Sequence, residues 1–376
     1  MIWNWQHKNW PKFSYDKEQL LGFEEKFLTK AGVLHGSMKH INDQDKESLK
    51  VNLISNEALK TSEIEGEILN RDSLQSSIRK HFGLKTDNRK IPPAEQGIAE
   101  MMVDLYKTFH LPLSHEYLFK WHEMLTNGRR DLIDIGSYRS HDDPMQVVSG
   151  AISNPTIHFE APASKKVKEE MQQFMTWFNR SEQQDSTKLP ILIRAGVAHL
   201  YFESIHPFED GNGRIGRAIS EKALSQNLQR PTLIAISHTI ESEKKAYYSA
   251  LHKNSKDLDI TNWLIYFSQM VLQAQNHTQS MIDFLIEKGK FYHRFNGKLN
   301  PRQEKVVSRI FLEGISGFRG GLSAENYIRI TDAPRATTTR DLQSLVEKGA
   351  FIKTGELKST RYFLNIDHDS VKNDNK

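Results

Sequence analysis

The chain has no cysteine among its 376 residues. Disulfide bonds, thiolate nucleophiles and zinc sites with cysteine ligands are therefore excluded, and this composition is compatible with a cytoplasmic protein. The sequence also lacks an apolar stretch near the roughly 18 residues that a membrane-spanning helix needs. Its N-terminus lacks the apolar core of a signal peptide. We therefore expect a cytoplasmic protein that does not engage a membrane.

A strong excess of one charge is missing too, since 51 Lys and Arg face 47 Asp and Glu. This net charge of +4 indicates no particular class of partner, and the length allows two or three domains. Apolar residues recur at spacings of three and four along most of the chain, which predicts a mainly helical protein. Two stretches, 144–162 and 349–366, have short β-prone runs around turn residues, and we expect each to form a hairpin.

The segment HPFEDGNGRIGR, at 206–217, contains a turn directly before a predicted helix. The turn consists of Gly211, Asn212 and Gly213. Glycine reaches backbone angles closed to other residues, and the N–H groups of such a turn and of a helix N-terminus bind anions. Arg214 and Arg217 are three residues apart and share one helix face. Two guanidinium groups beside this turn suit a polyphosphate.

Two further side chains of this segment predict the chemistry. Asp210 lies at the mouth of the turn, and a carboxylate among phosphates commonly binds Mg²⁺. His206 has an imidazole whose ordinary pKa of about 6.5 suits a general base. These groups together predict a nucleotide, magnesium and a base that activates a hydroxyl to attack a phosphate.

Other interpretations of the glycines and histidines are less favoured. The pattern Gly211-x-Gly213-x-x-Gly216 is similar to a dinucleotide-binding fingerprint, but a helical stretch precedes it where that fingerprint needs a strand. No Walker loop occurs. His122 and His199 have no close metal-binding spacing, and we expect ordinary packed or surface histidines.

The whole segment 206–217 resembles the signature of the Fic family, HxFx[DE]GNGRxxR, with every fixed position filled. The resemblance implies a helical bundle core and transfer of AMP from ATP to a tyrosine, threonine or serine hydroxyl of a target protein. It implies that His206 is the base and that Asp210 holds Mg²⁺. It assigns the α- and β-phosphates to the positions from Gly211 to Arg214, and the γ-phosphate to Arg217. Phe208 is expected to be a structural anchor and Glu209 to be solvated.

A second family motif, [ST]xxxE[GN], resembles the sequence TSEIEG at 61–66. Its spacing selects Thr61 and Glu65, rather than Glu63 or Glu67. The resemblance implies an inhibitory helix whose Glu65 pairs with Arg217 and displaces the γ-phosphate, so that inhibition acts within the chain. Two alternatives stay open: a merely solvated carboxylate, or a Glu65 that positions water to remove AMP from a modified protein.

The hairpin at 144–162 corresponds to the place of the family's flap. Its edge is expected to pair with an extended segment of the target, and Val148 and Gly150 to contact the nucleotide. An ordinary surface hairpin is the alternative. Tyr247 and Tyr248 resemble the family's adenine-side tyrosines, although helical spacing would place one of them in the core. Gly136, Tyr138 and Arg139 are also family-like.

We expect a small Fic-associated segment at 1–40, a Fic core at 41–295, a linker at 295–303, a winged helix at 300–365 and a disordered tail at 366–376. Trp3, Trp5 and Trp10 are expected to pack on the core. The winged helix would bind DNA or protein through 337–340, which is expected to begin its third helix, and through a wing with Lys358 and Arg361. A DNA-binding regulator that senses a nucleotide is therefore the alternative function, and the oligomeric state stays open, with a homodimer among the options.

Overall fold

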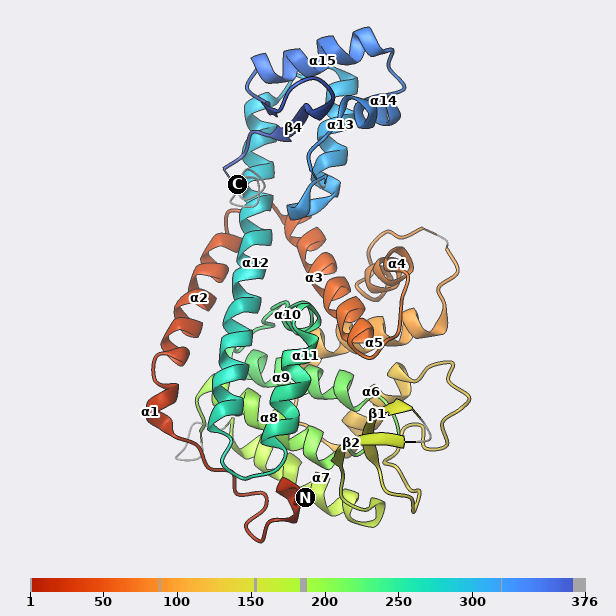
Figure 1. Cartoon of the computed structure of the whole chain (residues 1–376), viewed down its shortest axis with the longest axis vertical. Coiled ribbons are helices and arrows are strands. Elements are labelled where there is room, and N and C mark those ends of the chain that lie inside the picture. Colours follow the sequence, from red (N-terminus) through yellow and green to blue (C-terminus); the bar gives the residue numbers. More distant parts are fainter. Residues whose placement is uncertain (1, 88, 152–153, 183–187, 319, 368–376) are drawn as a thin grey trace. The chain divides into compact units, whose positions relative to one another are not determined.

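The computed structural model is mainly helical, as predicted, and describes residues 2–87, 89–151, 154–182, 188–318 and 320–367 (Figure 1). No helix in these ranges is long and apolar enough to span a membrane. The chain divides into a first unit, residues 1–31 and 47–275, and a second unit, residues 32–46 and 276–376. The division falls within three helices, which are α2 (Phe23–Met38), α3 (Asp43–Ile64) and α12 (Thr261–Phe295).

The first unit contains most of the N-terminal three quarters of the chain. Its other helices are η1 (Asn4–Gln6), α1 (Lys17–Leu20), α4 (Arg71–His81), α5 (Pro93–Thr108), α6 (His115–Leu125), α7 (Ser164–Arg180), α8 (Ile191–Ile205), α9 (Asn212–Leu228), α10 (Ile236–Ser242) and α11 (Lys244–Asn254). Its described strands are β1 (Gln146–Ala151) and β2 (Asn154–Glu160).

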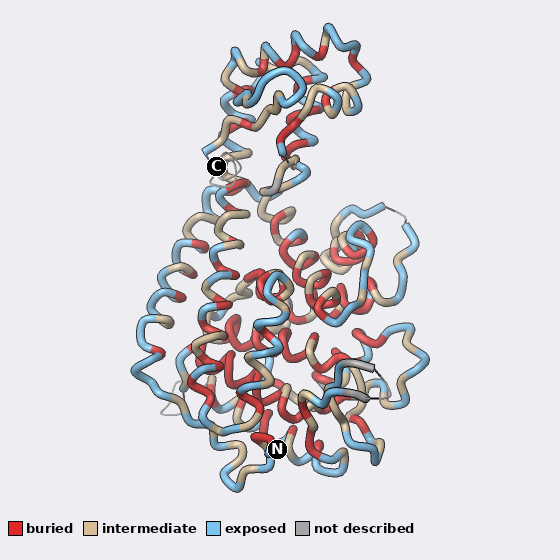
Figure 2. The backbone as a smooth tube through the Cα atoms, in the orientation of Figure 1, coloured by how far each residue is buried: buried red, intermediate tan, exposed pale blue. Residues whose placement is uncertain are grey.

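Helix α8 forms the centre of the first unit. It is apolar on nearly all sides, and almost every one of its residues is buried, as expected for a helix surrounded by others. Pro190 is the N-cap of α8, so the helix begins one residue after it, at Ile191. Helix α9 packs along α8, and the two are joined by the loop that carries the motif. Figure 2 shows the buried residues concentrated in these interior helices.

A buried arginine links α8 to its neighbours at the end of the helix away from the loop. Arg194 has no exposed surface, and it donates to carbonyl or side-chain oxygens of α7 and α9. It also donates to the Ser181 hydroxyl, and its guanidinium lies 4.4 Å from the Phe178 ring centroid. Burial lowers the pKa of Arg194 to about 10, so the group stays charged and needs these acceptors.

The hairpin β1–β2 is antiparallel, with an irregularity between Val147 and Val148. The N-terminus supports it, because Trp3 packs edge-on against Phe159 at 5.2 Å between ring centroids. Trp5 donates from its indole to the Glu160 carbonyl. The tryptophans Trp3, Trp5 and Trp10 thus pack on the first unit, with Trp10 against Tyr201.

The second unit contains helices followed by a hairpin, in the order predicted for a winged helix. The elements are α13 (Pro301–Leu312), η2 (Gly314–Ser316), α14 (Ala324–Thr331), α15 (Arg335–Glu347), β3 (Phe351–Thr354), η3 (Leu357–Ser359) and β4 (Arg361–Leu364). Its core includes Val306, Val307, Leu342, Leu345, Phe351 and Leu364. The buried carboxylate of Asp341 accepts from Asn300, Arg302 and Tyr327.

Two details of this unit differ from the predictions, and a third prediction falls mostly outside the described residues. Residues 295–303 are only partly a linker, because α12 ends at Phe295, which is buried, and α13 begins at Pro301. Helix α15 begins at Arg335 rather than at 337, since Pro334 caps it with φ and ψ suited to a helix entry, and Thr338 is buried. Most of the predicted tail, from 368 on, lies outside the described residues.

We expect Arg194→Met to lower the free energy of unfolding by about 3 kcal/mol, because several buried acceptors lose their donor. Denaturant unfolding measured by circular dichroism would test this. The exposed Arg71→Met on α4 is the matched control and should change stability little. Equal effects of the two variants would contradict the role assigned to Arg194.

Candidate active site

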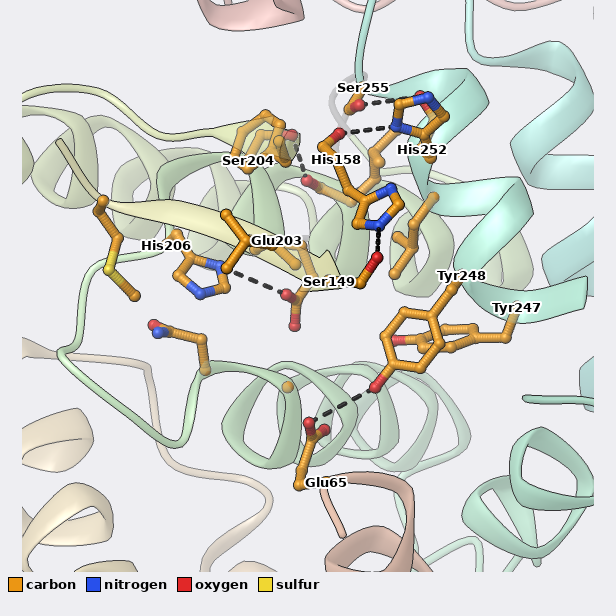
Figure 3. A pocket seen from close by; sticks show the side chains of 18 of the residues that line it. Glu65, Ser149, His158, Glu203, Ser204, His206, Tyr247, Tyr248, His252 and Ser255 are labelled. Atoms are coloured by element: carbon orange, nitrogen blue, oxygen red, sulfur yellow. Dashed lines mark hydrogen bonds and ion pairs between the residues drawn. The ribbon is translucent and has the colours of Figure 1, made fainter. Parts of the chain in front are cut away.

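A cavity of about 590 Å³ in the first unit brings most of the predicted site residues together (Figure 3). The end of α8, the loop after it, the start of α9, helix α11, strand β1 and the segment after α3 contribute to its wall. The predicted residues that line it are Glu65, Val148, His206, Asp210, Gly211, Asn212, Gly213, Arg217, Tyr247 and Tyr248. Arg214 is buried and is not among the lining residues. Gly150 is in β1 opposite Pro155, and its surroundings lie outside the described residues.

His206 lies where α8 ends in a sharp turn. Its φ of 51° is left-handed, so the chain leaves the helix abruptly. Arg139 holds this turn by donating to the His206 carbonyl at 2.9 Å and to the Pro162 carbonyl. Burial lowers the pKa of His206 to about 4, and the nearby Arg139 charge adds to the effect. The imidazole is therefore neutral at pH 7, the form that a general base requires.

The loop between His206 and α9 is closed by its own side chains. Asn212 accepts from the Phe208 N–H at 2.9 Å and donates to the Phe208 carbonyl at 2.8 Å. Gly211 has φ of 86°, and a Cβ atom there would lie 2.7 Å from Leu125 Cδ2. Only glycine fits this position. Gly211, Asn212 and Gly213 line the cavity at the N-terminus of α9, the end of a helix that attracts anions.

Phe208 and His122 support the loop from behind. Phe208 is fully buried and stacks on the His122 ring, with 4.3 Å between centroids. His122 is a packed histidine, as expected, and its partners fix its neutral tautomer: the ring accepts from the Gly136 N–H and donates to the Asp210 carbonyl. Glu209 is partly exposed, and its carboxylate also accepts from two backbone N–H groups, at residues 133 and 134.

Asp210 has an ionic partner that the sequence did not reveal. Arg129 donates to its carboxylate at 2.5 Å, and Arg214 lies 3.4 Å from the same oxygen. Because 81 residues separate Arg129 from Asp210, no local spacing predicts the pair. The Arg214 and Arg129 charges hold the pKa of Asp210 below its ordinary value, against the effect of burial.

A single carboxylate fits Mg²⁺ only in part. Asp210 is one third exposed and ionised, which suits a magnesium ligand. The described residues contain no cluster of three or more His, Cys, Asp or Glu that could hold a metal alone. Asp210 would therefore hold Mg²⁺ together with phosphate oxygens and water.

Both arginines of the motif are engaged by carboxylates from the segment after α3. Arg217 is almost fully buried and lies 2.7 Å from Glu65, while its Nε donates to the Thr61 hydroxyl at 2.7 Å. Arg214 donates to Glu67 at 2.7 Å. The spacing argument selected Glu65 and set Glu67 aside, yet both carboxylates contact a motif arginine.

The two tyrosines of α11 have different surroundings. Tyr247 is buried, and its hydroxyl lies 2.7 Å from His199 Nε2, so it belongs to the core as well as to the cavity wall. Tyr248 is about 38% exposed and donates to Glu65 at 3.5 Å. Figure 3 shows the two rings side by side, with the Tyr248 hydroxyl directed at Glu65.

Comparisons with known proteins agree with this geometry. A model described as the Fic/DOC family matches residues 112–224, and a model of a domain of unknown function (DUF4172) matches residues 3–84. The chain is 25% identical over 183 residues, 46% of its length, to a protein adenylyltransferase, fic-1, of Caenorhabditis elegans. It is 29% identical over 119 residues, 31% of its length, to a uridine 5'-monophosphate transferase of Xanthomonas campestris.

The chain spans 32% and 22% of the lengths of these two relatives. The crystal structure of a Fic family protein from Desulfovibrio desulfuricans has a TM-score of 0.52 at 18% identity. That likeness covers 91% of this chain and 96% of the other. At this identity it shows a shared fold.

The buried His199 generates a prediction about acid stability. Burial lowers the pKa of His199 to about 3, below the ordinary 6.5. The folded protein therefore keeps the ring neutral, hydrogen-bonded to Ser220 and Tyr247. This stabilisation is complete above pH 6.5 and is lost as the pH falls toward 3. Between pH 7 and pH 5 it accounts for about 2 kcal/mol of lost stability. We expect His199→Gln to remove this part of the pH dependence in urea unfolding.

The exposed His110→Gln is the control and should keep the wild-type pH dependence. An unchanged difference between pH 7 and pH 5 in His199→Gln would contradict the assignment.

Proposed function

We propose that this chain, a Fic-domain protein with its family domain at residues 112–224, transfers AMP from ATP to a hydroxyl of a target protein. The observation that carries the proposal is that His206, Asp210, the turn from Gly211 to Gly213 and Arg217 line one cavity, with the imidazole of His206 neutral at pH 7. The names of the two relatives support nucleotidyl transfer in general, and they differ in the nucleotide. Tyrosine, threonine or serine would be the acceptor.

In the proposed reaction the acceptor oxygen attacks the α-phosphorus of ATP, and the bond to the bridging oxygen breaks, so that pyrophosphate leaves. His206 Nε2 takes the proton of the acceptor hydroxyl. The N–H groups at the start of α9, with Arg214 and Arg217, would hold and orient the phosphates. Asp210 would hold Mg²⁺, which supplies positive charge to the phosphate oxygens.

The hairpin offers a surface for the acceptor. Among the described residues, β1 pairs only with β2, so its other edge can pair with an extended segment of the target. Val148 on β1 and Ile157 on β2 are both more than 40% exposed. Backbone pairing here would hold a hydroxyl over the cavity that His206 lines.

The segment after α3 is proposed to inhibit this reaction from within the chain. Glu65 occupies the guanidinium of Arg217, which the γ-phosphate would need. A Cβ atom at Gly213 would lie 2.3 Å from Glu65 Oε1, so the carboxylate also stands against the turn that would bind phosphate. ATP bound beside Glu65 would therefore be misplaced for in-line attack.

The experiment that tests the function is labelling of protein with ATP carrying the label on its α-phosphate. We expect Glu65→Gly to label at least about tenfold faster than wild type, because an ion pair worth about 1.4 kcal/mol suppresses the productive pose by that factor. The double variant Glu65→Gly with Arg217→Ala should lose the gain. Glu65→Gly with His206→Ala should bind ATP but transfer no label.

Parallel reactions with labelled UTP decide between the nucleotides of the two relatives. Absence of covalent label from either nucleotide in Glu65→Gly would refute nucleotidyl transfer. Reversible nucleotide binding with retention of DNA would favour the regulator instead. Loss of AMP from a modified target, abolished by Glu65→Gly, would favour the reverse reaction.

Glu67 generates a separate prediction. Because it neutralises Arg214, we expect Glu67→Gln to tighten ATP binding several-fold in the Glu65→Gly background, as a competing ion pair is removed. Isothermal titration calorimetry measures this directly. Glu63→Gln is the matched control, since Glu63 lies on the same helix end but pairs with Lys60. Equal affinities of the Glu67→Gln and Glu63→Gln variants would exclude an inhibitory role for Glu67.

A further inference from the structure

Two buried polar atoms near the base have no hydrogen-bond partner among the described residues. They are Oε1 of Glu203 and Nδ1 of His206. Glu203 lies on the last turn of α8, its side chain is 14% exposed, and its Oε2 is 3.7 Å from His206 Nδ1. Figure 3 shows the two side chains facing each other across the cavity wall.

Gly216 on α9 explains why the carboxylate of Glu203 stays in this position. A Cβ atom at Gly216 would lie 2.4 Å from Glu203 Oε1, so the space that glycine leaves open is filled by the carboxylate. Phe202 closes the same space from the side of α8, 3.3 Å from that Cβ position. The carboxylate is therefore enclosed between α8 and α9, next to the imidazole.

A general base of this kind needs a hydrogen-bond acceptor for its second ring nitrogen, and Glu203 is close enough to supply one. Nε2 accepts a proton only if its lone pair is free, and a neutral imidazole then carries its hydrogen on Nδ1. The Nδ1–H group needs an acceptor, and an acceptor with negative charge also stabilises the imidazolium that forms. Within the described part of the chain, the carboxylate and the backbone carbonyl of Glu203 are the acceptors placed near the His206 ring.

We propose that Glu203 is the positioning residue of His206, whose carboxylate accepts from Nδ1–H and leaves Nε2 free to take the acceptor proton. The distance of 3.7 Å shortens to a hydrogen bond when substrate is bound, as catalytic contacts commonly do. The kinetic test of this inference depends on the proposed nucleotidyl transfer. The spectroscopic test needs only the free protein.

The protonation of Glu203 gives the pair a distinctive pH dependence. Burial raises the pKa of Glu203 to about 8, the Arg217 charge lowers it, and Glu65 raises it again. Below that pH the protonated carboxyl donates to Nδ1 and Nε2 carries the ring hydrogen, so only the fraction of the protein with ionised Glu203 has Nε2 free to act as a base. Transfer should therefore increase as the pH rises toward and through 8. The other charged or titratable groups that act on the pair are Arg139, Asp210, Tyr247 and Tyr248.

The kinetic test compares Glu203→Gln and Glu203→Ala with their parent, Glu65→Gly, from pH 5.5 to 9.5. We expect the plateau of kcat/KM to fall about 100-fold, the range of general-base catalysis, with ATP affinity unchanged. The acid limb should move from near pH 8 to below about 6, because His206 alone has a pKa of about 4.

Glu170→Gln is the matched control, because Glu170 is another partly buried carboxylate with a raised pKa, bonded to Trp10 away from the cavity. If the acid limb of the pH profile stays in place in both Glu203 variants, the proposal is overturned. The backbone carbonyl of Glu203 would then be the group that accepts from Nδ1–H and fixes the tautomer of His206.

The spectroscopic test needs no turnover and no variant of Glu203. In ¹⁵N-histidine spectra of the wild-type protein, the His206 signals are those lost in His206→Ala. At pH 9 they should show Nδ1–H, and their shifts should titrate near pH 8 as Glu203 loses its proton. A ring that shows Nε2–H at pH 9, or no titration between pH 6 and 9, would overturn the proposal. If Glu65→Gly transfers no nucleotide, the proposed function fails, and this test still decides the role of Glu203.

Discussion

The short connection between α8 and α9 is the constraint on which the site depends. Both helices are buried, so the loop between them must satisfy its backbone groups within the protein rather than with water. The left-handed His206 ends one helix, and Asn212 closes the loop on Phe208 before the next helix begins. The same geometry that joins two core helices therefore places an imidazole and a helix N-terminus on one cavity.

The charges around this loop are paired before any ligand binds. Arg217 contacts Glu65, Arg214 contacts Glu67, and Asp210 contacts Arg129. Buried charges are costly without partners, so these arginines and this carboxylate need counter-charges within the protein. In this protein the counter-charges of both arginines come from one short segment after α3. Autoinhibition, as proposed, would be the functional side of this electrostatic requirement.

Local sequence patterns predicted the helices and hairpins better than the contacts between residues far apart in the chain. The helical spacing and the two β-prone stretches correspond to observed helices and hairpins, because these signals depend on neighbouring residues. Helix α15 begins at Arg335, two residues before the predicted start, because Pro334 caps it. Glu209 was assigned to solvent, since a lone acidic residue gives no sign of the distant N–H groups it accepts from.

The sequence by itself determined the mainly helical class and the segment 206–217, because glycine, asparagine and arginine at fixed spacings restrict backbone and charge locally. Only the tertiary structure decided which groups meet there. Arg129 reaches Asp210 across 81 residues, and Glu203 turns toward His206 because Gly216 on another helix leaves room. Such contacts depend on how helices pack, and packing is set by the whole core rather than by any one segment.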